Sequence, residues 1–203
     1  MSGPTFDVLI EGALPFNKYT RESREDVVCT TTLIESGGTR ILVDPGMYDD
    51  VLIAALAERE LQPDDIDLAF ITHFHGDHFK SLRILPNAEW LAASRELNAW
   101  SGGKVQADSL DIFGRLHPAP ERLADGVKLF ATPGHTVGHT GVLLARESEI
   151  VAIVGDAVFT GDYLRNREPS PNAVDWGQAL DTIDRIAELA DVVIPGHSGP
   201  VRL

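Results

Sequence analysis

The placement of the histidines constrains this chain more than any other feature of its sequence. Six of the seven histidines fall in three short segments, THFHGDH (72–78), PGHTVGH (133–139) and PGH (195–197), and each segment follows a predicted strand. Random placement would scatter them. Many polar groups placed directly after an apolar strand have little structural use, because burying them costs free energy unless they are partnered. The pattern therefore predicts metal binding.

The spacing within THFHGDH suits two metal ions. Side chains two apart on an extended segment point the same way, so His73 and His75 can converge on one ion. Gly76 lets the chain turn sharply, which can bring Asp77 and His78 toward a second ion. A carboxylate that follows the apolar run 150–155 could bridge the two ions.

The candidate metal ligands are His73, His75, Asp77, His78, His135, Asp156 and His197. Taken alone, an isolated histidine is more often a hydrogen-bonded structural residue and an isolated aspartate a helix cap, so the prediction depends on the heptapeptide. Imidazole and carboxylate ligands without thiolate suit zinc, iron, manganese or cobalt. We expect two divalent ions, with zinc preferred and iron or manganese as alternatives.

The chain is predicted to contain two similar units, whose strands lead into these histidine segments. The first unit is predicted to contain strands over 27–35 and 40–43, a helix over 48–60 and a strand over 66–72. The second is predicted to contain strands over 140–144 and 150–154, a helix over 174–189 and a strand over 192–194. The stretch between them, which contains Trp90, Trp100 and His117, is expected to be less regular and to complete the surface over the first unit. Two units sharing one core predict a mixed α/β (α+β) fold, a four-layer αβ/βα sandwich formed by a single domain over 1–203.

Composition limits the partners. A net charge of −14 opposes binding to nucleic acid, because phosphate contacts need Lys and Arg. The amino terminus lacks the pattern of a signal peptide, and no apolar run approaches the roughly 20 residues that span a bilayer. We expect a soluble, cytoplasmic protein that acts on a small molecule, away from membranes. Cys29, the only cysteine, is expected to be a buried thiol.

The segments THFHGDH, TPGHTVGH, IVGDA and IPGH, in this order, resemble the metallo-β-lactamase superfamily. The resemblance runs from about the first predicted hairpin to the carboxyl terminus, and its SGGTRILVDPG and VVIPGHSGP segments are most similar to the group around metallo-β-lactamase domain-containing protein 1. It implies a first metal held by His73, His75 and His135. It implies a second held by Asp77, His78 and His197, with Asp156 bridging. A homodimer is also left open, since family members often form dimers.

The function expected from these residues is hydrolysis of a small ester-like substrate, whether lactone, thioester or phosphoester. Asp77 would orient a hydroxide shared by the two ions. Three alternatives are an RNA phosphodiesterase, a mononuclear iron sulfur dioxygenase and a metal-dependent binding protein without activity. Asp156 stands where cysteine-using β-lactamases have Cys, His75 where flavodiiron proteins have Glu, and Phe159 where quorum-quenching lactonases have Tyr.

Several further residues are weaker candidates. The resemblance implies that Asp44 supports a ligand histidine, with a turn-forming role as the alternative. His139 could hydrogen-bond the PGH loop, and His117 is expected on an ordinary loop. The stretch 163–167 is expected on a loop that is either solvated or in contact with substrate. Phe16, Lys18 and Tyr19 could form a flap over the site.

Overall fold

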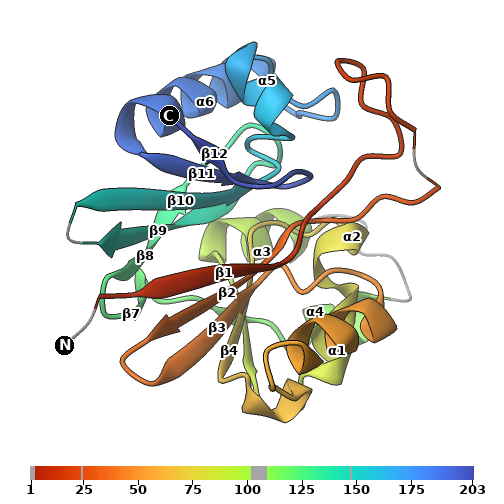
Figure 1. The fold of residues 1–203 in the computed structure, drawn as a ribbon, viewed down its shortest axis with the longest axis vertical. Coiled ribbons are helices and arrows are strands. Elements are labelled where there is room, and N and C mark those ends of the chain that lie inside the picture. The colour runs from red at the N-terminus through yellow and green to blue at the C-terminus, as the bar shows by residue number, and fades with distance from the viewer. Residues whose placement is uncertain (1–2, 24, 102–108, 147) are drawn as a thin grey trace.

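The computed structural model describes residues 3–23, 25–101, 109–146 and 148–203, which form two six-stranded sheets packed face to face (Figure 1). The first sheet has the order β1 (Thr5–Ile10), β2 (Thr31–Ser36), β3 (Thr39–Val43), β4 (Leu68–Ile71), β5 (Glu89–Ala92) and β6 (His117–Pro118). The second has the order β12 (Val201–Arg202), β11 (Val192–Pro195), β10 (Glu149–Gly155), β9 (Thr140–Arg146), β8 (Val127–Ala131) and β7 (Arg122–Ala124).

Helices cover the outer face of each sheet (Figure 1). The first sheet is covered by α1 (Asp49–Ala57), α2 (Gly76–Phe79), α3 (Ser94–Ser101) and α4 (Leu110–Phe113), with two 3₁₀ turns, η1 (Pro63–Asp65) and η2 (Lys80–Ile84). The second is covered by α5 (Gly161–Arg165) and α6 (Trp176–Leu189). The structure therefore has four layers in the order helix, sheet, sheet, helix, as the sequence predicts. None of the helices in the described ranges has the length and apolar character needed to cross a bilayer.

Three apolar layers hold these elements together. Successive residues of a strand point to opposite faces of its sheet, so a strand covered on both faces is apolar throughout. In β3, Ile41 faces the layer between the sheets and Leu42 faces α1. In β10, Ile153 faces the layer between the sheets and Ala152 faces α6. The near-continuous apolar runs of the sequence therefore belong to the central strands.

The predicted repeat of two units is confirmed in the topology. In the first unit, the β2–β3 hairpin is followed by α1 and by β4, which pairs parallel to β3. In the second, the β9–β10 hairpin is followed by α6 and by β11, which pairs parallel to β10. The predicted boundaries differ most at the first strand, which begins at Thr31 rather than residue 27. The preceding residues leave the sheet, because Val28 pairs with Ala13 in an isolated bridge and the Thr30 amide donates to the carbonyl oxygen of Gly196.

The stretch between the two units is more regular than the sequence predicts. It contributes β5, α3, α4 and β6 to the first half, and β7 and β8 to the second sheet. The expectation that it covers only the first half is therefore wrong. These strands have two to five residues each, too few to establish a hydrophobic period in the sequence.

Candidate metal centre

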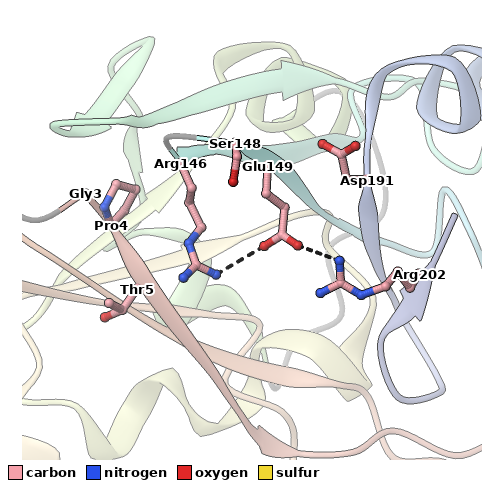
Figure 2. A pocket seen from close by; sticks show the side chains of 8 residues that line it. All are labelled: Gly3, Pro4, Thr5, Arg146, Ser148, Glu149, Asp191 and Arg202. Carbon is pink, nitrogen blue, oxygen red and sulfur yellow. Dashed lines mark hydrogen bonds and ion pairs between the residues drawn. The ribbon is translucent and has the colours of Figure 1, made fainter.

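Polar side chains gather at both ends of the paired sheets. At the end where β1 and β10 begin, a hollow of about 540 Å³ is lined in part by Arg146, Glu149 and Arg202 (Figure 2). Both guanidinium groups donate to Glu149, Arg146 at 3.2 Å and Arg202 at 2.8 Å. Their charges are thus partly compensated by the half-buried carboxylate of Glu149, and the lining residues described for this hollow include no histidine. The candidate metal ligands lie at the opposite end of the sheets.

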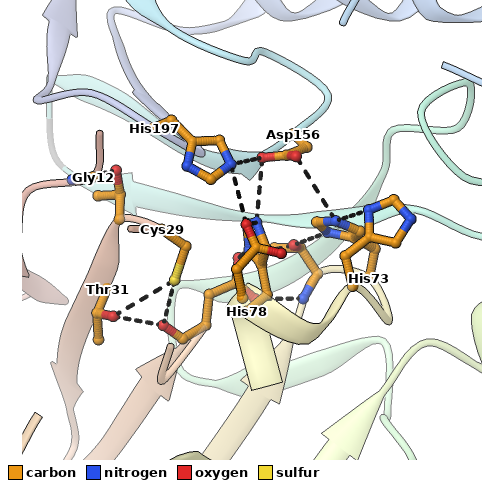
Figure 3. Close-up of polar contacts among 12 residues, drawn as sticks. Gly12, Cys29, Thr31, His73, His78, Asp156 and His197 are labelled. Atoms are coloured by element: carbon orange, nitrogen blue, oxygen red, sulfur yellow. Dashed lines mark hydrogen bonds and ion pairs between the residues drawn. The ribbon is translucent and has the colours of Figure 1, made fainter. Parts of the chain in front are cut away.

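The predicted ligand segments meet at that opposite end. The parallel strands β3 and β4 end beside one another in the first sheet, and β10 and β11 do so in the second. Asp44 and His73 lie just beyond the first pair of strand ends, and Asp156 and His197 just beyond the second. Because carboxyl ends of parallel strands share one edge, residues far apart in sequence come together there (Figure 3).

The first ligand set consists of His73, His75, His135 and Asp156, whose nearest ligand atoms all lie within 4.8 Å of one another. Nδ1 of His75 lies 3.0 Å from Nε2 of His73 and 3.0 Å from Nε2 of His135. Oδ2 of Asp156 lies 3.4 Å from Nε2 of His135. Three imidazole nitrogens and one carboxylate oxygen therefore face a common point.

The second ligand set consists of Asp77, His78 and His197, also within 4.8 Å of one another. Nε2 of His78 and Nε2 of His197 lie 3.7 and 3.6 Å from Oδ2 of Asp77. The same two nitrogens lie 3.3 and 3.1 Å from Oδ1 of Asp156. Asp156 therefore turns one oxygen toward each set (Figure 3), the geometry that a bridging ligand requires.

The unpaired atoms of this cluster fit metal ions. Nε2 of His78 and Oδ1 of Asp156 are buried and have no hydrogen-bond partner among the described residues, although they lie 3.3 Å apart. Buried polar atoms in folded proteins almost always have a partner. Polar atoms that converge in this way are satisfied by a cation bound between them, so the donor set present suits divalent metals.

Groups behind the ligands fix the orientation of their rings. Asp44 accepts a 3.0 Å hydrogen bond from Nδ1 of His78, and 2.8 Å bonds from the amide and hydroxyl of Thr72. Nδ1 of His73 contacts the Thr72 hydroxyl at 3.0 Å, and Nδ1 of His197 donates to the carbonyl oxygen of Val28 at 2.8 Å. Each contact leaves Nε2 directed at the cluster, which is how outer partners set the tautomer of ligand histidines.

His139 packs behind the first ligand set. Its ring stacks on His73 at a centroid distance of 4.9 Å, and its Nδ1 lies 2.8 Å from the hydroxyl of Thr132. The Thr132 amide also donates to the carbonyl oxygen of His139. His139 therefore closes the base of the loop that carries His135, which agrees with the hydrogen-bonding role that the sequence suggested.

Glu96 is a supporting residue that the sequence analysis missed. It lies on α3 with 1% of its surface exposed. One carboxylate oxygen accepts hydrogen bonds from the Phe74 amide and the Trp100 indole, and the other accepts from the Thr136 hydroxyl and the Gly138 amide, at 2.7 to 3.1 Å. Glu96 thereby ties together the loops that carry His75 and His135. A glutamate on a short helix gives no sequence signal for this role, because such residues are usually solvated.

Burial and nearby charges shift the histidine pKa values in opposite directions in the two ligand sets. Burial lowers the pKa of His73 well below its usual value and that of His135 to about 4, so both rings are neutral and offer lone pairs. Burial also opposes protonation of His78 and His197, but the combined attraction of nearby acidic groups, with Asp156 the largest contributor, outweighs burial and raises the pKa of both. Without a cation, the second set holds protons beside Asp156, so metal binding there should release them.

Cys29 lies close to this cluster but does not belong to it (Figure 3). Its side chain is buried, as expected, and its thiol donates to the carbonyl oxygen of Asp44 at 3.6 Å. Burial raises the pKa of Cys29 to about 12. Since the thiolate is the form that binds metals, Cys29 acts as a small apolar side chain.

The weaker candidates have mixed outcomes. The expectation of a loop over 163–167 is partly wrong, because α5 extends to Arg165 and Tyr163 is buried. Lys18 and Tyr19 both contact Glu168, and the Tyr19 ring packs edge-on against Tyr163, so the proposed flap is attached beside α5.

Two other expectations concern exposed side chains. Phe16 of the proposed flap is 57% exposed. His117 is exposed on β6 rather than on a loop, and it lies outside both ligand sets.

Comparison with known proteins agrees with the fold. The Metallo-beta-lactamase superfamily matches residues 24–197. Metallo-beta-lactamase domain-containing protein 1 of Rattus norvegicus is 34% identical over 180 residues, covering 85% of this chain and 67% of the rat protein. A metallo-hydrolase of Methanocaldococcus jannaschii is 29% identical to this chain over 163 residues, and the match covers 79% of this chain and 72% of the archaeal protein.

A solved structure shows the same fold. The crystal structure of a metallo-beta-lactamase from Thermotoga maritima superimposes with a TM-score of 0.75 at 23% identity, covering 99% of this chain and all of that one. The predicted resemblance is thus confirmed both in sequence and in architecture. The chain belongs to the metallo-β-lactamase superfamily and is a metal-dependent hydrolase.

Proposed function

We propose that this protein is a dinuclear metallohydrolase that cleaves small ester-like substrates. The observation that carries the proposal is the position of Asp156, whose Oδ2 faces the nitrogen of His135 while its Oδ1 faces those of His78 and His197. A single carboxylate shared by two ligand sets favours two ions over one. Zinc suits the imidazole-rich donor set, and iron or manganese would be accepted by the same atoms.

The chemistry follows from what the side chains present to a substrate. When bound, a pair of divalent ions lowers the pKa of water toward neutrality and stabilises the negative charge that develops on a carbonyl or phosphoryl oxygen. Asp77 is the most exposed ligand carboxylate, at 19% of its side chain compared with 5% for Asp156. Asp77 could therefore orient the attacking water and accept its proton, while the buried Asp156 would help to hold the ions.

The first experiment measures metal content and hydrolysis together. Protein purified without added ions would be analysed for metals and then assayed, with zinc, iron or manganese, on lactone, thioester, phosphodiester and β-lactam substrates. We expect about two ions per chain and turnover of an ester-like substrate. Single-stranded RNA is included as a test of the alternative RNA phosphodiesterase activity. We expect no cleavage of RNA, because a net charge of −14 opposes its binding. Preferential cleavage of RNA, or oxygen consumption with a persulfide, would select one of the alternative activities.

Variants test the two ligand sets separately. His73→Ala should lose the first ion and His197→Ala the second, and each should lower kcat by at least about 100-fold because the shared water loses one side of its site. Asp77→Asn should also lower kcat by about 10² or more, since its amide accepts no proton. His117→Ala is the matched control, because His117 is exposed and outside both sets. Wild-type metal content and rate in both ligand variants would contradict the proposal.

A further inference from the structure

An open apolar pocket of about 340 Å³ adjoins the first ligand set at His75. Four apolar side chains contribute to its wall: Ala99 and Trp100 from α3, together with Val137 and Val174. Val137 is 49% exposed and Val174 is 64% exposed. Two exposed valines facing one hollow beside a reactive centre leave apolar surface in water that a ligand could cover.

The pocket wall is attached to the loops that hold the metal ligands. Val137 lies two residues after His135, and the amide of Val174 donates to the carbonyl oxygen of His135 at 3.3 Å. The Trp100 indole is fixed by its 2.8 Å hydrogen bond to Glu96. A group bound in this pocket is therefore held in a defined position relative to the first set, as productive orientation requires.

The charge of the pocket favours one class of substrate. Its described lining comprises the four apolar residues, Thr136, His75 and Glu96, and it contains no lysine or arginine. Glu96 is already engaged in four hydrogen bonds. An anionic group such as a phosphodiester backbone would find no cationic partner here, whereas an alkyl or aryl group would be removed from water.

We propose that this pocket binds the apolar acyl group of the substrate, so that the enzyme prefers carboxylic esters and thioesters with an apolar acyl chain over phosphoesters. The inference rests on the proposed hydrolase function and assigns its substrate class. The volume is at the lower end of the range of about 300–1,000 Å³ that is usual for small-molecule pockets. The acyl chain contacts Val137, Val174 and Trp100 while the scissile carbonyl lies at the ligand cluster.

A series of p-nitrophenyl esters tests the proposal, because the leaving group stays constant while the acyl chain grows. For metal-loaded wild type, kcat/KM should rise about tenfold or more from acetate to hexanoate. The double variant Val137→Thr/Val174→Thr keeps side-chain size but replaces one methyl group of each valine with a hydroxyl, and it should bring this ratio close to one. Ile53→Thr, at an exposed position of α1 outside the pocket, is the matched control.

A binding measurement that needs no turnover accompanies the kinetics. Hexanoate should change the fluorescence of Trp100, and Trp100→Phe should abolish the change while Trp176→Phe, at an exposed position of α6, should preserve it. The double valine variant should weaken hexanoate binding by about tenfold.

The outcomes separate this inference from the proposed function. Esters cleaved without any dependence on acyl length, or bis(p-nitrophenyl) phosphate cleaved faster than every ester, would overturn the pocket assignment and leave the hydrolase intact. If no ester or phosphoester is cleaved, the proposed function fails, and the hexanoate titration decides the pocket alone. Binding that Trp100 reports and the valine variant weakens supports it, and no binding overturns it.

Discussion

Nδ1 of His78, in α2, donates a 3.0 Å hydrogen bond to Asp44, a residue 34 positions earlier that directly follows β3. Asp44 also accepts both the amide and the hydroxyl of Thr72, which precedes the ligand His73. One buried carboxylate thus aligns ligands of both sets. Asp44 and Thr72 therefore hold the ligand histidines in a defined orientation, although neither belongs to a ligand set.

Asp44→Asn should weaken metal binding without removing a ligand. Asp44 has a φ of 51°, a left-handed conformation that Asn tolerates, so the backbone should be kept. Loss of the carboxylate charge behind His78 should lower the affinity for the second ion by about 10–100-fold, measured by competition with a chromophoric chelator. Asp50→Asn, at an exposed position of α1, is the control. Unchanged affinity in both variants would show that Asp44 serves only the turn.

Glu96→Gln should destabilise the fold and loosen the first ligand set. A glutamine amide nitrogen would face donors that now bond to a carboxylate oxygen, so at least one buried donor loses its acceptor. We expect a loss of about 1–3 kcal/mol in the free energy of unfolding of the metal-free protein, measured by denaturant titration. Zinc affinity at the first site should fall in parallel. Glu89→Gln, at an exposed position, should change neither quantity.

Gly196→Ala should displace the Asp156 carboxylate through steric contact alone. A Cβ at this position would lie 2.0 Å from Oδ1 of Asp156 and 3.0 Å from its amide nitrogen. Because the carboxylate must move, metal content should drop below two per chain and kcat should fall by about 10². Gly177→Ala provides the comparison, since its nearest neighbour would be at an ordinary 3.6 Å. A fully active, fully loaded Gly196→Ala protein would mean that Asp156 has room to shift.

Metal removal should lower thermal stability. In the absence of ions, the negative charge of the buried Asp156 is balanced, among the described residues, by protons on the imidazoles of His78 and His197. Free zinc at about 100 times its dissociation constant should add about 2.7 kcal/mol per independent site. Calorimetry with and without EDTA should show a Tm that rises with free zinc. The His73→Ala/His197→Ala double variant should lack this dependence, and a Tm indifferent to EDTA in wild type would argue against tight metal binding.

The sequence by itself determined the layered fold and the ligand candidates. Local geometry fixes the features that could be predicted, because each depends on residues close together in the sequence. These features are the apolar runs, the helical spacing of α1 and α6, and the position of each histidine segment after a strand. His73 and His75 could be assigned to one face because alternation along an extended segment is fixed by the backbone. The short strands β5 to β8 lacked such a period and were not recognised.

The family resemblance implied how the ligands divide, but only the tertiary structure decided the geometry that divides them and the residues that support them. The two oxygens of Asp156 face different sets because the packing of two sheets fixes the direction of that carboxylate. Glu96 bonds to Phe74, Thr136 and Gly138, which are 22, 40 and 42 residues away, and no periodicity in the sequence encodes such contacts. The exposure of Val137 and Val174 around one pocket has the same origin, since burial depends on which distant segments cover a side chain.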